Sequence, residues 1–218
     1  MDFAQARFNM VEQQIRPWDV LNTRILAAIE QTPREHFVPL AHQKLAYADL
    51  EIPLDCGEYM MSPKLEARLL QALDPQPSEI CLEVGTGSGY LTACLARLCA
   101  QVDSIEIHAP LKQAATQRLK AQGIENCQVR EGDAAYGYTR MRMRYDLIAV
   151  TGSLPEYHPA FEQQLTLGGR LFVITGEGYA MQAHLITRLG EGEFAREVLL
   201  ETHVPALQGV KVPDRFVF

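Results

Sequence analysis

A glycine-rich turn between an expected strand and an expected helix constrains the fold of this chain more than any other feature. The segment LEVGTGSGY, residues 82–90, follows a short apolar run and opens the stretch YLTACLARL. Gly85, Gly87 and Gly89 allow a tight turn and a close approach of the backbone to a ligand, which a Cβ atom would obstruct. Such a loop is typical of a nucleotide-binding turn at the carboxyl end of a parallel strand.

The rhythm of strand, turn and helix continues from residue 79 towards the C-terminus. Strands are expected over 79–85, 101–107, 127–132, 145–152 and 169–176, with helices over 90–100, 110–123 and 159–165. Alternation of this kind indicates parallel βαβ units. We therefore expect an α/β fold with a doubly wound, mostly parallel sheet, to which the segment 194–207 adds one or two C-terminal strands.

The N-terminal part of the chain predicts helices. Apolar residues recur at helical spacing over 2–31, with a break at RPWD, residues 16–19, where proline interrupts the pattern. Residues 63–74 begin with proline and repeat leucine on one face, which predicts an amphipathic helix. We expect a single domain over 1–218, in which 1–62 form a helical cap and a loop and 63–218 form the α/β core.

Composition excludes several classes of protein. The net charge of -7 argues against binding of nucleic acid through its phosphates. The five cysteines form no CxxC pair and the six histidines are scattered, so neither disulfides nor a metal centre is expected. No apolar run approaches the ~18 residues of a membrane span. We expect a soluble, cytoplasmic protein without a membrane partner, in which TRMRMRYD is a polar segment leading into a strand.

Acidic residues accompany the glycine loop at three expected strand ends. Glu83 precedes the loop, Glu106 ends the next strand, where it can accept from ribose hydroxyls, and Asp133 follows the third, where it can serve an adenine edge. A carboxylate beside the loop would repel a pyrophosphate and favour a cation. Tyr90 also stands where a dinucleotide loop has its third glycine. These features favour S-adenosylmethionine, which carries an ammonium and a sulfonium, over a dinucleotide.

Taken together, the segments resemble the protein-L-isoaspartate O-methyltransferase family of Class I S-adenosylmethionine-dependent methyltransferases. MVEQQI, PREHFVP and AYADLEIPL are similar to that family's cap, LEVGTGSGYLTACLARL and VDSIEI to its cofactor motifs, and YDLIAVTGSLPE, QLTLGGRLFVITG and THVPALQG to its later segments. The resemblance implies methylation of the carboxylate of isoaspartyl residues in damaged proteins or peptides, with S-adenosylmethionine as donor and S-adenosylhomocysteine as product.

The resemblance also implies which residues hold the cofactor. Glu83, Gly85, Thr86, Gly87 and Ser88 would surround its methionine end, with Gly89 completing the loop, Glu106 and Ile107 at the ribose, Asp133 and Ala134 at the adenine, and Thr151 beneath the transferring methyl. Catalysis in such an enzyme would depend on in-line positioning and on exclusion of water.

The segment DCGEYMMSP, residues 55–63, departs from the family's usual loop G-Q-T-I-S-x-P. We name these residues the acceptor loop. Aligned on its glycine and its proline, the loop has Glu58 in place of the glutamine, Tyr59 in place of the threonine and Met61 in place of the serine, with Ser62 one place late. The candidate contacts to a methyl acceptor are therefore Tyr59, Met61 and Ser62, and we expect the loop to form a pocket wall.

The sequence is compatible with three functions. The chain could be an isoaspartyl methyltransferase in which the Tyr59 hydroxyl replaces a lost one. It could instead methylate a more apolar small molecule, because Met60 and Met61 would give a soft wall while Asp55 and Glu58 would disfavour a carboxylate. The third alternative is a non-catalytic protein that binds S-adenosylmethionine and uses its cap to bind a partner.

Overall fold

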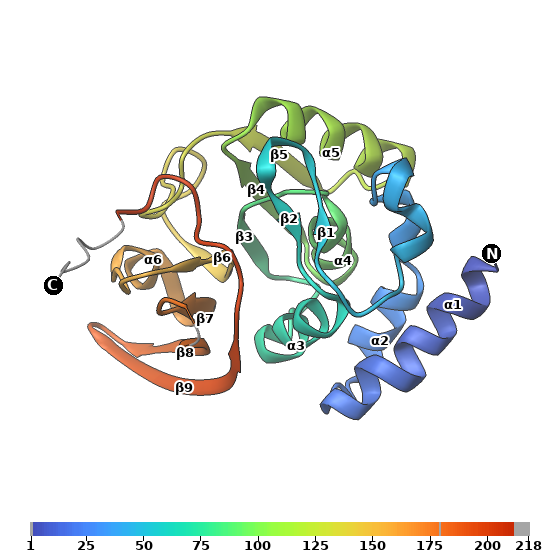
Figure 1. The fold of residues 1–218 in the computed structure, drawn as a ribbon. Coiled ribbons are helices and arrows are strands. Elements are labelled where there is room, and N and C mark those ends of the chain that lie inside the picture. The colour runs from blue at the N-terminus through green and yellow to red at the C-terminus, as the bar shows by residue number, and fades with distance from the viewer. Residues whose placement is uncertain (1, 179, 212–218) are drawn as a thin grey trace, which may run out of the picture.

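A mixed sheet forms the centre of the computed structural model, which describes residues 2–178 and 180–211 (Figure 1). Within these residues seven strands lie in the order β5-β4-β3-β6-β7-β8-β9. They are β3 (Ile80–Val84), β4 (Gln101–Glu106), β5 (Cys127–Glu131), β6 (Tyr145–Leu154), β7 (Leu165–Thr175), β8 (Met181–Gly190) and β9 (Glu193–Thr202). The strands from β5 to β7 are parallel, and β8 is antiparallel to both β7 and β9. The predicted α/β fold is confirmed.

Helices pack against the sheet because its central strands are apolar on both faces. They are α3 (Pro63–Leu73), α4 (Tyr90–Leu98), α5 (Ala109–Ala121) and α6 (Ala160–Gln163). Side chains alternate along a strand, so Cys81 belongs to one apolar core while its neighbour Leu82 belongs to the other. The first core extends into α3, α4 and the cap, and the second includes Phe161 of α6. Burial on both faces is what a parallel sheet requires.

The cap consists of short helices followed by a small hairpin. Helices α1 (Phe3–Met10) and α2 (Thr23–Glu30) are separated by a π-helical turn over Val11–Ile15 and a 3-10 turn over Arg16–Trp18, which is the predicted break. Further 3-10 turns follow, and β1 (Ile52–Pro53) then pairs with β2 (Tyr59–Met60) in the acceptor loop. Figure 1 shows α1 and α2 at the opposite end of the molecule from β8 and β9.

Two details of the sheet differ from the expectation. Strand β8 was not predicted, because its residues form no continuous apolar run and its alternation of buried and less buried residues breaks at His184 and Leu185. The expected turn at Gly168 is an irregularity inside β7, where the pairing partners of β6 shift from Leu165 to Arg170. The described helices include none that is both long and apolar enough to span a bilayer.

Candidate functional site

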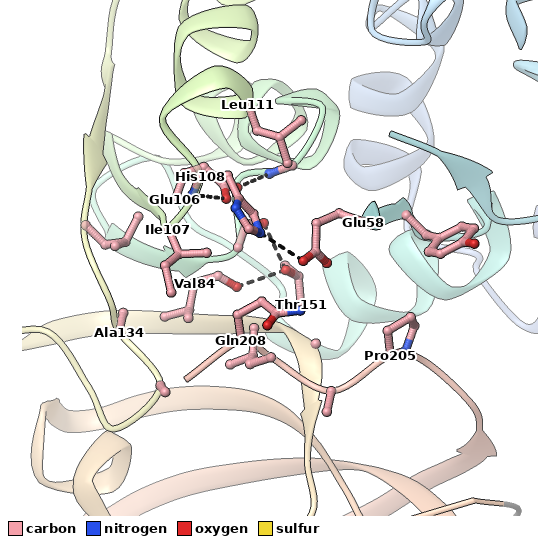
Figure 2. Close-up of a pocket in the computed structure, with 18 of the residues that line it drawn as sticks. Glu58, Val84, Glu106, Ile107, His108, Leu111, Ala134, Thr151, Pro205 and Gln208 are labelled. Atoms are coloured by element: carbon pink, nitrogen blue, oxygen red, sulfur yellow. Dashed lines mark hydrogen bonds and ion pairs between the residues drawn. The ribbon is translucent and has the colours of Figure 1, made fainter. Parts of the chain in front are cut away.

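A cavity lies at the carboxyl ends of β3, β4 and β6. The chain order reverses at this point, because β4 and β5 lie on one side of β3 whereas β6 and β7 lie on the other. Ligands of doubly wound sheets bind at such a switch point. About 750 Å³ of empty space lies between the lining residues of the cavity, and this volume includes open solvent. Figure 2 shows side chains from several loops converging on it.

Most of the predicted cofactor residues line this cavity. They lie near the carboxyl ends of four neighbouring strands and comprise Gly85, Gly87, Glu106, Ile107, Asp133, Ala134 and Thr151. Sequence reasoning could place each of them only at the end of a strand. The structure brings these ends together, because parallel neighbours present their carboxyl ends at the same edge of the sheet.

The floor of the cavity is formed where Gly85 and Thr151 meet. The Thr151 hydroxyl lies 2.9 Å from the carbonyl oxygens of both Val84 and Gly85 and can donate to either (Figure 2). Gly85 has a φ of +96°, and a Cβ atom there would lie 2.3 Å from Thr151 Oγ1. Only glycine fits this position, because a side chain would be strained and would collide with the floor.

Glu106 connects the end of β4 to the glycine loop. Its Oε2 accepts a hydrogen bond from the backbone N–H of Gly87 at 2.8 Å, and its Oε1 accepts from the N–H of His108 at 2.9 Å. The carboxylate is almost completely buried and lines the cavity. It therefore fixes the glycine loop and faces the position predicted for a ribose.

Glu83 is not among the described residues that line the cavity, and its contact with the cofactor stays a prediction. Its Oε2 accepts from the hydroxyls of Thr92 at 2.5 Å and Ser104 at 2.6 Å. Burial raises the pKa of Glu83 to about 8, although these two bonds oppose the shift. The side chain is buried because the alternation of β3 directs it towards α4, and at neutral pH it is mostly protonated. Glu83 thus joins the end of β3 to α4 and β4.

Three further loop residues predicted to touch the cofactor also lie outside the cavity lining. The Thr86 hydroxyl is 2.5 Å from that of Ser104. Ser88 Oγ accepts from the backbone N–H of Tyr90 at 3.2 Å. A Cβ atom at Gly89 would lie 3.2 Å from Cβ of Ala115, so this glycine allows close packing against α5. These contacts help to fix the conformation of the glycine loop, although the three residues do not line the cavity.

The acceptor loop forms the other wall of the cavity. Tyr59 is half exposed and lines it, and Met61 lines it although its side chain is buried. Met60 is buried in the core, since neighbouring residues of β2 face opposite sides. Ser62 lies outside the lining and makes no side-chain cap to α3. The two methionines therefore divide between core and wall.

A histidine that the sequence did not indicate joins the two walls. His108, just before α5, has its Nε2 atom 3.0 Å from Oε1 of Glu58 (Figure 2). Both side chains are about a quarter exposed and line the cavity. The partners are 50 residues apart, so no local pattern could have revealed the pair.

The C-terminal segment 204–208 completes the lining. Ser153 of β6 donates its N–H to the Pro205 carbonyl at 2.9 Å and accepts from the N–H of Leu207 at 3.0 Å. The only signal for this wall was the resemblance carried by THVPALQG. That segment contains no motif that indicates a particular ligand.

The charge of the cavity is negative. Its acidic residues are Glu51, Glu58, Glu106 and Asp133, and the described residues that line it include no lysine or arginine. Such a surface attracts cations. Burial raises the pKa of Glu51, and the charge of His203 opposes this shift. Over the described part of the chain, no cluster of three histidine, cysteine or acidic residues suits a metal ion.

The sequence matches the family model of protein-L-isoaspartate(D-aspartate) O-methyltransferase over residues 5–211. The chain belongs to this family. A protein-L-isoaspartate O-methyltransferase of Syntrophus aciditrophicus is 39% identical over 189 residues, which is 87% of this chain and 86% of that protein. Protein-L-isoaspartate O-methyltransferase 2 of Pelobacter propionicus is 34% identical over 203 residues, or 93% of this chain and 90% of that protein.

A solved structure shares the fold of this family member. It is the Plasmodium falciparum protein described as a protein-L-isoaspartate O-methyltransferase and crystallised with S-adenosyl-L-homocysteine. The alignment has a TM-score of 0.78 at 19% identity and covers 95% of this chain and 99% of that one. At this identity the match supports the fold, including the helical cap and the C-terminal strands.

Proposed function

We propose that this chain transfers a methyl group from S-adenosylmethionine to the carboxylate of L-isoaspartyl residues in proteins or peptides. Membership of the family over residues 5–211 is the observation that carries this proposal. The cavity supports it, since it lies at the switch point of the sheet and combines a glycine loop with an acidic lining.

The residues of the cavity suit S-adenosylmethionine. Its acids favour a ligand that carries an ammonium and a sulfonium. Glu106, Asp133 and Ala134 line the cavity, so the first is available to the ribose hydroxyls and the other two to the adenine, and Gly85 leaves the floor open above Thr151. When bound, the cofactor supplies an electrophilic methyl group on its sulfonium.

The protein needs little acid or base chemistry for this reaction. A carboxylate acceptor is already ionised at neutral pH, so the residues of the cavity have to orient it and exclude competing water. Met61 supplies an apolar wall, and the half-exposed Tyr59 offers a hydroxyl to an acceptor carboxylate. Rate enhancement then depends on how accurately the two walls face each other.

Incubation with labelled S-adenosylmethionine and an isoaspartyl peptide tests the proposal, with the same peptide containing normal aspartate as control. We expect base-labile methylation of the isoaspartyl peptide alone. Gly85→Asp should abolish it, because its side chain would enter the cavity floor. Cofactor binding by the wild type without turnover above the Gly85→Asp background would contradict the proposal.

The acceptor wall supports a second candidate, a more apolar acceptor. Met61 replaces a hydroxyl of the usual loop, and the acids Glu51 and Glu58 face the space that an anionic acceptor would enter. If this wall disfavours isoaspartate, Met61→Ser will raise methylation of the isoaspartyl peptide. A fall or no change would count against the second candidate.

A cytoplasmic location and the absence of a nucleic-acid partner also belong to the proposal. They are supported by the net charge of -7 and by five free cysteines. Fractionation of cells that express a tagged chain tests the location, and a filter-binding titration with RNA and DNA tests the partner.

A further inference from the structure

A buried arginine of the cap connects the acceptor loop to the glycine-loop side of the molecule. Arg34 lies in a 3-10 turn over Arg34–His36 and is fully buried. One terminal nitrogen pairs with Glu66 of α3, and the other donates to the carbonyl oxygen of Met61 at 2.6 Å. The guanidinium also lies over the ring of Tyr90, 4.5 Å from its centroid. A single side chain therefore contacts the acceptor loop, α3 and α4.

Stability alone does not account for this arrangement. Removing two charges from water costs several kcal/mol per ion, and an apolar pair of similar volume is often equally stable or more stable. Burial raises the pKa of Glu66 to about 7, although Arg34 opposes the shift. The Nε atom of Arg34 has no hydrogen-bond partner among the described residues. Because the pair of Arg34 and Glu66 is costly to bury, it is better explained by the positions that it imposes on neighbouring residues than by its contribution to stability.

The contact with Met61 supplies that role. The guanidinium binds the backbone carbonyl of Met61 from the core, while the side chain of the same residue lines the cavity. The guanidinium of Arg34 also packs over the ring of Tyr90, which directly follows Gly89 of the glycine loop. The position of the acceptor loop relative to the glycine loop thus depends on the rigid, planar guanidinium of Arg34.

We propose that Arg34 is a positioning residue for methyl transfer, which keeps the wall at Met61 at a fixed distance from the glycine loop. This inference rests on the proposed function for its kinetic consequence. Arginine is required because its planar fork makes two directed bonds and stacks on an aromatic ring, whereas a lysine ammonium can do only part of this. Arg34 acts through the backbone of Met61 and does not line the cavity itself.

The decisive variant is the double substitution Arg34→Met with Glu66→Leu. It removes both buried charges together, so the fold avoids an unpaired ion, while the Met61 carbonyl loses its donor. We expect a melting temperature nearer to wild type than that of Arg34→Met alone. The Kd for S-adenosylhomocysteine should stay within about twofold, because the cofactor wall is unchanged. KM for the isoaspartyl peptide should rise about tenfold, which corresponds to one lost charge-assisted hydrogen bond.

A second readout needs no turnover. With methionine methyl groups labelled with carbon-13 and Met61 assigned through Met61→Leu, we expect its resonance to shift or broaden in the double variant. The resonance of Met181 should stay in place, because β8 pairs only with β7 and β9 among the described strands and none of the substituted residues lies on these strands. This spectrum is recorded with S-adenosylhomocysteine added, so it remains informative if the wild type methylates no isoaspartyl peptide and the proposed function fails.

Two controls separate positioning from stability. Arg34→Lys keeps the charge and should give an intermediate KM. The pair Arg16 and Glu12 is an exposed ion pair of the cap, so Arg16→Met with Glu12→Leu should leave both readouts unchanged. A double variant at Arg34 and Glu66 that keeps the wild-type KM and an unmoved Met61 resonance would overturn the proposal.

Discussion

The two walls of the cavity differ in the part of the chain that forms them: one is mainly backbone and the other is mainly side chains. The cofactor wall consists of backbone turns at strand ends, fixed by bonds such as those from Gly87 to Glu106 and from Thr151 to the end of β3. The acceptor wall consists of side chains on and beside a two-residue strand, tied to its surroundings through Glu58 and through the carbonyl of Met61. A wall made of backbone admits few substitutions, whereas a wall made of side chains can change its chemistry residue by residue. This contrast accounts for the ease with which the glycine loop is recognised in the sequence, whereas the residues of the acceptor loop are freer to vary.

The largest effect is expected from an alanine on the cofactor wall. Gly85→Ala would place a Cβ atom 2.3 Å from Thr151 Oγ1 at a φ of +96°, and we expect the Kd for S-adenosylmethionine to rise about 100-fold or more, as the floor must shift. Isothermal titration calorimetry measures it. The matched control in the acceptor loop is Gly57→Ala. Gly57 has a φ of +78°, and a Cβ atom added there would meet nothing within 4 Å.

Gly57→Ala should lower stability by about 1 kcal/mol through its backbone alone and leave the Kd unchanged. Equal losses of cofactor affinity in the two variants would remove the proposed difference between the walls.

A smaller effect concerns the acid beneath the glycine loop. The pKa of Glu83 is raised to about 8 from the ordinary 4.5, so the folded state binds its proton more tightly than the unfolded state. Wild-type stability therefore falls as pH rises from about 4.5 to 8, because the carboxyl ionises in the unfolded state while it stays protonated in the folded state. Glu83→Gln lacks this loss and should gain about 4 kcal/mol relative to wild type over the same window, at roughly 1.4 kcal/mol per pH unit.

Urea unfolding of both proteins at pH 5 and pH 8 measures this gain. Glu66→Gln, at a buried acid whose pKa is about 7, provides a comparison in which the paired Arg34 loses its countercharge. A relative stability of Glu83→Gln that does not change with pH would show that Glu83 is ionised in the folded protein.

On the acceptor wall, opposite effects are expected from the two members of one pair. Glu58→Gln removes a negative charge from the space that the acceptor carboxylate enters, so kcat/KM for the isoaspartyl peptide should rise about fivefold, in keeping with roughly 1 kcal/mol of repulsion at short range. His108→Gln removes the partner of Glu58 and should lower kcat/KM. Initial rates at saturating cofactor measure both, and changes of the same sign would contradict this assignment.

The smallest effect is expected at Tyr59. Tyr59→Phe removes only a hydroxyl, and we expect KM for the isoaspartyl peptide to rise about threefold, the loss of one modest hydrogen bond, with the cofactor Kd unchanged. Ser62→Ala is the control in the same loop, since Ser62 lies outside the cavity lining. A larger effect at Ser62 than at Tyr59 would reverse their assignment.

Local sequence patterns predicted the parts of this molecule that depend on near neighbours. The apolar runs of β3 and β6 and the glycines between β3 and α4 were sufficient for the fold and for the place of the cavity. Strand β8 escaped because its alternation is incomplete, with His184 and Leu185 only partly buried. Its place in the sheet depends on pairing with β7 and β9.

The details of the cavity could not be predicted in the same way. Glu83 lies beside the glycines in sequence, but its direction follows from the strand, and its partners Thr92 and Ser104 come from α4 and β4. The contact between His108 and Glu58 joins residues 50 positions apart. Such contacts are properties of the tertiary fold.

The order of these walls along the chain has a consequence for synthesis and proteolysis. All seven strands of the central sheet are complete by Thr202, yet the segment 204–208 that lies against Ser153 supplies one side of the cavity. During translation the sheet can therefore assemble before the pocket is closed. A protease that cut the chain just after β9 would leave the sheet intact and remove that side. Affinity for the cofactor thereby distinguishes an intact chain from one clipped at this point, whereas a measure of secondary structure would not.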